Sequence, residues 1–308
     1  MIKLNKISLD YEPRKKILPK LKDNPQGFRN PEMSEFDSAF LCGLLETYRP
    51  KKILEVGVAS GATTSIILQV LEDLGKSYEM HSVDASADWY RDRTKPTGFV
   101  ATFAKENNLF SRSALCGKYE YPLENNLFIP LPVNLLGSHE FHLGKYLPQV
   151  IDEIGGDIDF LILDTVHSLP GEVLDFPVML PYLKDGAIVV LHDVSYNHVY
   201  LKWHGYATTT VLCSVTAEEK FINFETETEH KPYRYPNIAA FSICEQTRKY
   251  IENLFLSLVI TWSYIPDDKQ LEIYREFYKG HYPAELVDIF NEAIKMNVDR
   301  MAKQQAAK

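Results

Sequence analysis

Three consecutive segments near the start of the chain restrict the fold more than any other feature of the sequence. Lys52 to Gly57 is a short apolar run with the character of a β-strand, and Ala62 to Leu74 carries apolar residues at helical spacing. A second short strand, Glu79 to Asp84, follows at once. Strand, helix and strand in this order predict a βαβ unit with parallel strands and a right-handed crossover.

Two later apolar runs indicate that the sheet continues. Asp157 to Asp164 (DIDFLILD) and Ala187 to Asp193 (AIVVLHD) are almost continuously apolar, as strands are when helices bury both of their faces. A helix is expected between them at Gly171 to Leu183, and further strands at Thr209 to Val215 and Ile238 to Cys244. We therefore expect an α/β fold with a mostly parallel sheet and helices on both faces.

The two ends of the chain are expected to add helices to this sheet. The first helix is expected to begin at Asn30, with Pro31 in its first turn. Apolar residues recur at helical spacing from Thr247 to Ile260 and from Pro266 to Met301, with apolar surface to close over the sheet or to pair two subunits in a homodimer. The expected division is an N-terminal extension (residues 1–30), a central domain (31–247, with an insertion at about 90–137) and a helical C-terminal extension (248–308).

Composition and charge exclude several classes of protein. The 308 residues carry 33 Lys and Arg against 42 Asp and Glu, and the basic residues are scattered, so nucleic acid is not an expected partner. The 4 cysteines have no paired spacing, which predicts reduced thiols in a cytoplasmic protein. Apolar runs fall short of the ~20 residues of a membrane span, and the N-terminus lacks the apolar core of a signal peptide.

The turn after the first strand, EVGVASG at residues 55–61, is suited to a polar ligand. Gly57 lets a ligand approach the backbone, and Gly61 leaves the first N–H groups of the next helix free. Asp84 ends the neighbouring strand, where it can accept hydrogen bonds from both hydroxyls of a ribose or, alternatively, cap a following helix. The dinucleotide fingerprint G-x-G-x-x-G is missing, which makes a dehydrogenase a poor interpretation.

A second group of polar residues follows two of the later strands. Asp164 ends one apolar run with His167 three residues on, and His192 and Asp193 end the other. Ligands of open α/β sheets lie outside the carboxyl ends of the strands. If these strands are neighbours, ~4.8 Å apart, Asp164 and Asp193 can share one divalent cation. Alone, each Asp is explained as a cap and each His as an interior residue, but together they favour a site.

These motifs resemble those of a known enzyme family. ILEVGVASGATTSIIL (residues 53–68) resembles motif I of the class I S-adenosylmethionine (SAM)-dependent methyltransferases, and HSVDAS (81–86) resembles the second-strand motif whose acid holds the ribose. Residues 159–194 look like the branch that includes cephalosporin-type, macrolide-sugar-type and polysaccharide-cluster O-methyltransferases. The similarity covers about residues 51–244 and implies a Rossmann-like methyltransferase sheet.

The resemblance implies a role for each matching residue. The expected cofactor-binding residues are Glu55, Gly57, Ser60, Gly61, Asp84 and Asp164. Asp164 and Asp193 are implied to bind Mg²⁺, as they do in metal-dependent members of the family. Those members often have another acidic residue beside the second Asp, whereas this chain has His192, a ligand type that favours softer ions than Mg²⁺.

The expected activity is methyl transfer from SAM to a hydroxyl of a small, sugar-like acceptor, assisted by a divalent cation. His167, in the loop beside the metal, is the expected general base; alternatively it orients the loop or binds the metal, and His192 is the base. Other interpretations are an N-methyltransferase acting on a small amine, which needs neither metal nor strong base, and a SAM-binding protein without activity. The presence of Asp164, His167 and Asp193 together favours catalysis.

Overall fold

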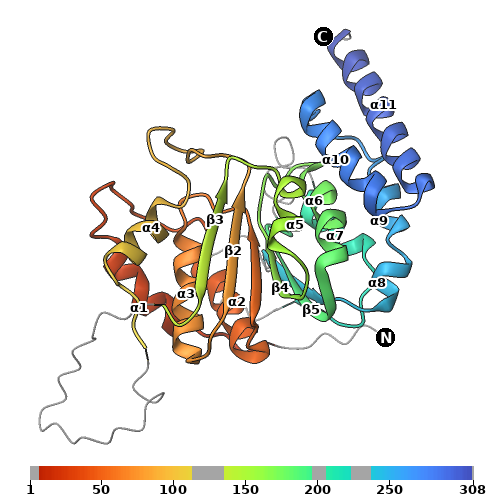
Figure 1. Ribbon diagram of the computed structural model, residues 1–308. Coiled ribbons are helices and arrows are strands. Elements are labelled where there is room, and N and C mark those ends of the chain that lie inside the picture. The colour runs from red at the N-terminus through yellow and green to blue at the C-terminus, as the bar shows by residue number, and fades with distance from the viewer. Residues whose placement is uncertain (1–6, 113–134, 196–205, 223–236, 307–308) are drawn as a thin grey trace, which may run out of the picture.

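The centre of the protein is a seven-stranded sheet in the order β3-β2-β1-β4-β5-β7-β6 (Figure 1). The computed structural model describes residues 7–112, 135–195, 206–222 and 237–306. The strands are β1 (Lys52–Val56), β2 (Glu79–Asp84), β3 (Ser138–Leu143), β4 (Ile158–Leu163), β5 (Leu183–His192), β6 (Lys220–Ile222) and β7 (Ile238–Ser242). Strands β1 to β5 pair in parallel, and β7 is antiparallel to both of its neighbours. This confirms the predicted mostly parallel, Rossmann-like sheet.

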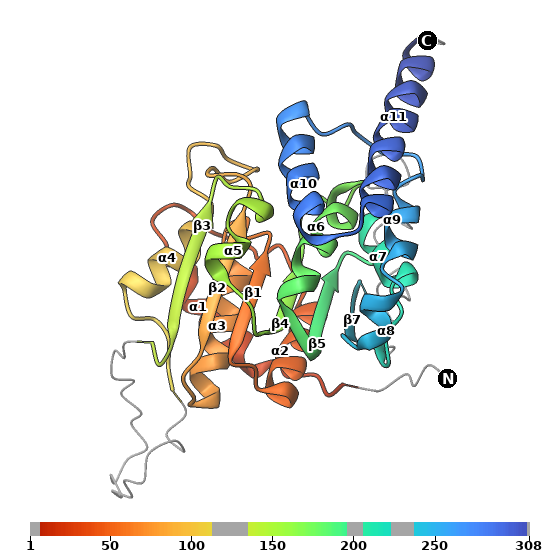
Figure 2. The same cartoon turned by 45° about the vertical axis from the view of Figure 1, so that its right-hand side comes forward.

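Helices cover both faces of this sheet (Figures 1 and 2). One face is covered by α1 (Glu12–Leu21), α2 (Glu35–Tyr48), α3 (Ala62–Leu74) and α4 (Phe99–Glu106). The other is covered by η2 (Leu147–Gln149), α5 (Ile151–Ile154), α6 (Gly171–Met179), η3 (Leu180–Tyr182), α7 (Ala207–Ser214) and α9 (Glu252–Ser257). Helix α8 (Glu245–Lys249) follows β7, and α10 (Asp268–His281) and α11 (Ala284–Ala306) pack on these helices outside the sheet. No helix among the described residues has the length and apolar character needed to cross a membrane.

Side chains of the central strands alternate between two hydrophobic cores. In β4, Phe160 and Ile162 pack with the core under α1 to α4, whereas Leu161 and Leu163 pack with the core under α5 to α11. Because both faces are covered, every position from Phe160 to Leu163 is apolar, which is the pattern that the sequence shows. Helix α1 belongs to the first of these cores, since its residue Ile17 is fully buried there.

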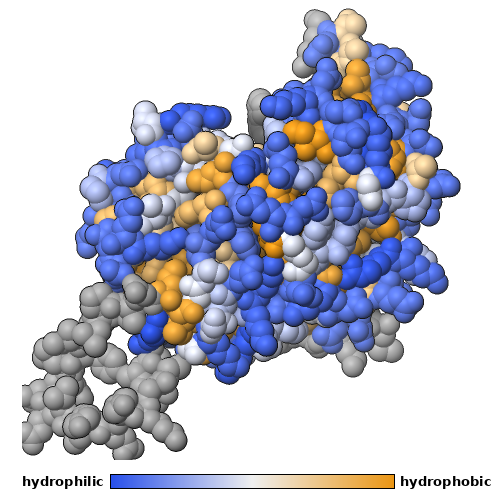
Figure 3. Space-filling model, in the orientation of Figure 1, coloured by the Kyte–Doolittle hydropathy of each residue, from blue (hydrophilic) through white to orange (hydrophobic). Residues whose placement is uncertain are grey.

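The C-terminal helices pack on α6 and α9. The hydroxyl of Tyr278 in α10 donates to the carbonyl of Leu174 in α6 at 2.6 Å, and α11 packs against α9 and α10. The far end of α11 projects from the body of the protein (Figure 2). Figure 3 shows hydrophobic side chains on the polar surface of these helices, where Met296 and Val298 are exposed.

Two local predictions were wrong. Helix α2 begins after Ser34, whose hydroxyl accepts the N–H of Asp37, and not at Asn30. A strand was predicted at Thr209 to Val215, but all of these residues except Val215 lie in the helix α7, although threonine and valine favour strands. Hydroxyls in α7 bond to backbone carbonyls just after β5, so tertiary contacts override the propensity. The predicted insertion contains α4, and its residues 113–134 lie outside the described residues.

Candidate active site

The glycine turn after β1 is shaped by close contacts within the chain. Gly57 has a φ of 96°, and a Cβ atom there would lie 1.7 Å from the carbonyl oxygen of Asp164. Gly61 has a φ of 85°, and a Cβ there would lie 3.0 Å from the Cα of Gly98. Both conformations favour glycine. The sequence explained Gly57 by the approach of a ligand, whereas in the structure the backbone just after β4, at Asp164, lies against this glycine.

Asp84 is held against this turn by backbone N–H groups. Its Oδ2 accepts from the nitrogens of Val58 at 2.9 Å and Ala59 at 3.2 Å, and its Oδ1 accepts from Ser86 at 2.8 Å. A carboxylate offers about four acceptor positions, so about one remains for a ribose hydroxyl, where the sequence predicted two hydrogen bonds. The alternative role as a helix cap was wrong, because α4 begins only at Phe99.

The side chain of Ser60 faces the segment that precedes α2. Its hydroxyl donates to Glu32 Oε2 at 2.7 Å, and the other oxygen of Glu32 accepts from the indole of Trp89 at 3.2 Å. These bonds fasten residues before α2 and after β2 to the glycine turn. Glu32 was missed in the sequence, because only the folded chain brings it to the turn.

Glu55 is fully buried beside the turn. Its Oε2 accepts from the hydroxyls of Thr64 at 2.7 Å and Ser82 at 2.6 Å, and its Oε1 has no hydrogen-bond partner among the described residues. Burial raises the pKa of Glu55 to about 8. The carboxyl group therefore holds its proton at neutral pH, and an unpartnered polar atom lies next to the predicted cofactor turn.

Replacing Glu55 by glutamine is expected to stabilise the protein increasingly as the pH rises. The ordinary pKa is 4.5 and the folded value about 8, so between these values the folded chain holds a proton that the unfolded chain releases. The free energy of unfolding of the parent therefore falls across this window, by up to ~1.4 kcal/mol per pH unit. Glutamine keeps an oxygen acceptor for Ser82 and Thr64 but does not titrate.

Urea unfolding of parent and variant at steps of pH tests this expectation. The stability difference between them should grow with pH and level off above about pH 8. Glu285→Gln, an exposed change in α11 that also removes one carboxyl group, is the matched control. A constant difference for Glu55→Gln would contradict a raised pKa.

The predicted acid and histidine residues come together at the carboxyl ends of β4 and β5. These strands are neighbours, with Leu163 paired to Leu191, as the shared cation site required. Asp164 Oδ1 lies 3.1 Å from His192 Nδ1, and Asp193 Oδ2 lies 3.0 Å from His167 Nε2. The ligand atoms of Asp164, His167 and Asp193 all lie within 4.8 Å of one another.

Backbone strain accompanies this cluster. His167 has a φ of 58° and Asp193 a φ of 60°, in the left-handed region that few residues other than glycine adopt. Strained backbone of this kind is concentrated at functional sites, where the surrounding structure holds it. Here Glu172 Oε1 accepts the backbone N–H of His167 at 2.8 Å, and the amide of Asn237 donates to Asp193 Oδ1.

The supporting residues come from elements distant in sequence. Glu172 begins α6, Asn237 precedes β7, and Asp37 in α2 places its Oδ2 3.6 Å from His192 Nε2. None was predicted from the sequence. The only sequence signal for Asn237 was its position directly before a predicted strand. That signal did not point to the site, because the pairing of β7 with β5, which places Asn237 beside Asp193, was not predictable.

Charges within the cluster compensate one another. Burial lowers the pKa of His192, but Asp164 and Asp193 raise it well above its usual value. Burial also opposes protonation of His167, but Glu172, Asp164 and Asp193 raise its pKa to about 9. Burial would raise the pKa of Asp164, yet the two histidines hold it below its usual range. The Asp164 carboxyl group is therefore ionised at neutral pH.

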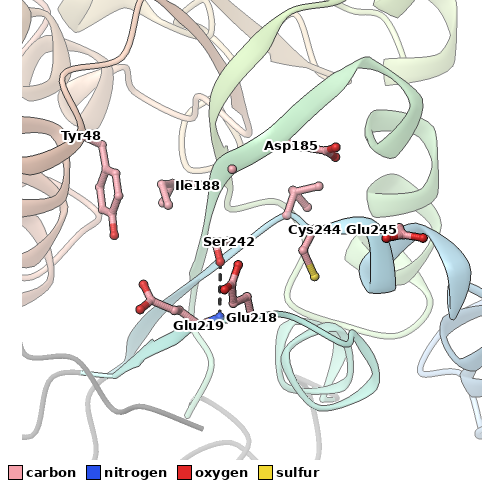
Figure 4. Close-up of a pocket in the computed structure, with 10 residues that line it drawn as sticks. Tyr48, Asp185, Ile188, Glu218, Glu219, Ser242, Cys244 and Glu245 are labelled. Atoms are coloured by element: carbon pink, nitrogen blue, oxygen red, sulfur yellow. Dashed lines mark hydrogen bonds between the residues drawn. The ribbon is translucent and has the colours of Figure 1, made fainter. Parts of the chain in front are cut away.

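A pocket of about 430 Å³ lies at the other end of the sheet (Figure 4). It is lined by the start of β5 and the end of β7, with Tyr48, Glu218 and Cys244 among its side chains. Because β5 begins there and ends at His192, this pocket is separate from the acid and histidine cluster.

The chain is similar to one family model and to several solved structures. Residues 54–194 match a family model described as a methyltransferase domain, and this range contains every predicted site residue. No curated protein matches the chain. Among solved structures, an O-methyltransferase from Bacillus cereus in complex with SAH is 13% identical, covers 76% of this chain and 92% of its own, and has a TM-score of 0.45. The O-methyltransferase TomG from Streptomyces achromogenes, in complex with SAM, is 16% identical, covers 77% of this chain and 92% of its own, and has a TM-score of 0.45.

Proposed function

We propose that residues 54–194 form a class I SAM-dependent methyltransferase domain and that the chain transfers the methyl group to the hydroxyl oxygen of a small acceptor. One observation carries the proposal: the acid and histidine cluster directly adjoins the cofactor turn. The N–H of Asp164 donates to the carbonyl of Val56 at 2.9 Å, and the Asp164 carbonyl fills the place of a Gly57 side chain. A cofactor on the turn would therefore lie beside Asp164, His167 and Asp193.

The residues around the turn fit SAM. Asp84 has an acceptor position left for a ribose hydroxyl, and Glu55 has a buried, unpartnered Oε1 next to the turn. SAM supplies a sulfonium-activated methyl group, so the protein needs no covalent nucleophile. The task of the chain is to align the acceptor oxygen with the cofactor and to remove the hydroxyl proton.

Asp164 and Asp193 are proposed to hold a divalent cation. Their carboxylate oxygens lie within 4.8 Å of each other, and carboxylate oxygens are donors that suit a hard divalent cation. Mg²⁺ is the ion that the resemblance implies. Such an ion supplies positive charge beside the acceptor hydroxyl as its proton leaves.

His167 is proposed as the base rather than His192. The side chain of His167 is 22% exposed, whereas that of His192 is 6% exposed and lies between Asp164 and Asp37. His167 is therefore the imidazole that an acceptor can reach. A cation bound at Asp164 and Asp193 would offset the negative charge that raises the pKa of His167, which would leave a neutral imidazole to accept the proton. His192 is proposed to position Asp164, through the contact between Nδ1 and Oδ1.

The acceptor is proposed to be a sugar-like molecule, a choice supported by the resemblance of residues 159–194 to sugar and polysaccharide O-methyltransferases. Incubation with SAM and matched panels of small sugars and small amines, read by mass spectrometry, tests the acceptor class. Methylated sugar hydroxyls are the expected products. Methylation of amines alone, undiminished by chelator, would overturn the proposal in favour of an N-methyltransferase.

A further inference from the structure

A second group of metal-ligand side chains lies on strands β2 and β3, at the edge of the sheet. His81 in β2 pairs in register with Glu140 in β3, and Val83 pairs with His142. In a parallel pair, residues in register point to the same face, as do residues two apart along one strand. His81, Glu140 and His142 therefore share one face. Strand β1 separates them from β4 and β5, which carry the active-site cluster.

The three side chains converge at short range. His81 Nδ1 and His142 Nε2 are 3.0 Å apart, and with a carboxylate oxygen of Glu140 the ligand atoms all lie within 4.8 Å of one another. Both imidazoles are withdrawn from solvent: the side chain of His81 is 12% exposed and His142 is 5% exposed. Two little-exposed ring nitrogens thus face each other beside a carboxylate.

Glu79 provides a second, independent observation. Its Oε1 lies 2.8 Å from His81 Nε2 and 2.9 Å from the ammonium of Lys52, which also donates to the carbonyl of Ile154. A carboxylate on the far nitrogen of a histidine is the usual support of a metal-bound imidazole, because it keeps the proton on that nitrogen. Here it directs the lone pair of Nδ1 toward His142 and Glu140.

We propose that His81, His142 and Glu140 bind a zinc ion. Two imidazoles and one carboxylate are a zinc donor set, with a fourth position left for water, and this set favours zinc over Mg²⁺. Bound zinc would fasten the edge strand β3 to β2, one residue pair short of Asp84 and its partner Leu143. The ion would stabilise the strand end that carries the ribose acid, apart from the cation at Asp164 and Asp193.

Calorimetric titration of the chelator-treated protein with Zn²⁺ tests the site. An Asp164→Asn, Asp193→Asn background removes the carboxylates of the active-site cluster, so that the remaining binding reports the strand edge. One equivalent of Zn²⁺ should bind and raise the melting temperature. Co²⁺ in place of Zn²⁺ should give the visible absorption of a four-coordinate site with nitrogen ligands.

Single variants in this background assign the ligands. His142→Asn should abolish stoichiometric binding, and Glu79→Gln should weaken it about 10- to 100-fold while leaving the stoichiometry unchanged. His139→Asn is the matched control, because His139 lies on the same strand but bonds to Ser82 and Lys105 on the other face. It should retain the parent affinity.

Three results would overturn the zinc site: no stoichiometric binding by the background protein, parent-like affinity in His142→Asn, or equal losses in His139→Asn and His142→Asn. Circular dichroism without metal checks that each variant folds. If His142→Asn does not fold, His81→Asn and Glu79→Gln decide the question, and parent-like affinity in both would equally refute it.

Discussion

Replacement of either Asp164 or Asp193 by asparagine is expected to lower kcat for methyl transfer at least ~100-fold. Asparagine keeps the shape and one oxygen of the side chain but removes the negative charge that is proposed to hold a cation between β4 and β5. A cation beside a developing alkoxide contributes several kcal/mol, and each 1.36 kcal/mol corresponds to about tenfold in rate. The same loss is expected when the parent is assayed in chelator, with recovery on adding Mg²⁺ or Mn²⁺.

Initial rates at saturating SAM and acceptor measure this effect. Asp157→Asn is the matched control: Asp157 is exposed, lies just before β4 at its other end, and has a φ of 63° that asparagine tolerates. It should keep the parent rate. Full activity in chelator, together with active Asp164 and Asp193 variants, would contradict metal assistance.

The same assay distinguishes the proposed roles of His167 and His192. His167→Asn is expected to lower kcat with little change in KM for SAM, because the proposed base acts on the acceptor. His192→Asn removes the contact with Asp164 Oδ1 and is expected to raise the cation concentration needed for half-maximal rate. Loss of turnover only in His192→Asn, at all cation concentrations, would move the base to that position.

Periodicity along the chain predicted five of the seven strands, β1, β2, β4, β5 and β7, but neither β3 nor β6. The apolar runs that became β1, β4 and β5 are buried on both faces, so tertiary structure reinforced the local pattern. The positions of Asp164 and Asp193 followed from the same reasoning, because the carboxyl ends of adjacent parallel strands meet at one edge. Strand adjacency was the one assumption needed, and the register of Leu163 with Leu191 confirms it.

Residues that support the site were not predictable by this route. Glu172, Asn237 and Asp37 reach the cluster from α6, from the segment before β7 and from α2, and nothing local in the sequence distinguishes them from surface polar residues. The contact that requires a glycine at position 57 was not predictable either, because it is made by Asp164, more than a hundred residues away in the sequence. Contacts at such sequence separation exist only once the sheet has formed.

Loss of the Asp84 carboxylate is expected to weaken the binding of SAH, the demethylated cofactor, at least tenfold. A hydrogen bond to a charged group contributes ~1.5–3 kcal/mol, and ~1.4 kcal/mol corresponds to a tenfold change in Kd. Asp84→Ala removes the proposed bond to the ribose and also the bonds to Val58 and Ala59 that fix the glycine turn. Both effects act in the same direction.

Isothermal titration with SAH measures the affinity, and two further variants separate the two effects. Asp88→Ala changes an exposed acid in the same loop and should bind SAH as the parent does. Asp84→Asn keeps one carbonyl oxygen that can accept the N–H groups of the turn but lacks the charge, so its affinity should fall between those of the parent and Asp84→Ala. The ribose role of Asp84 requires a loss in both Asp84 variants. An alanine variant that folds and binds SAH with the parent affinity would refute that role and leave Asp84 as a residue that only fastens the turn.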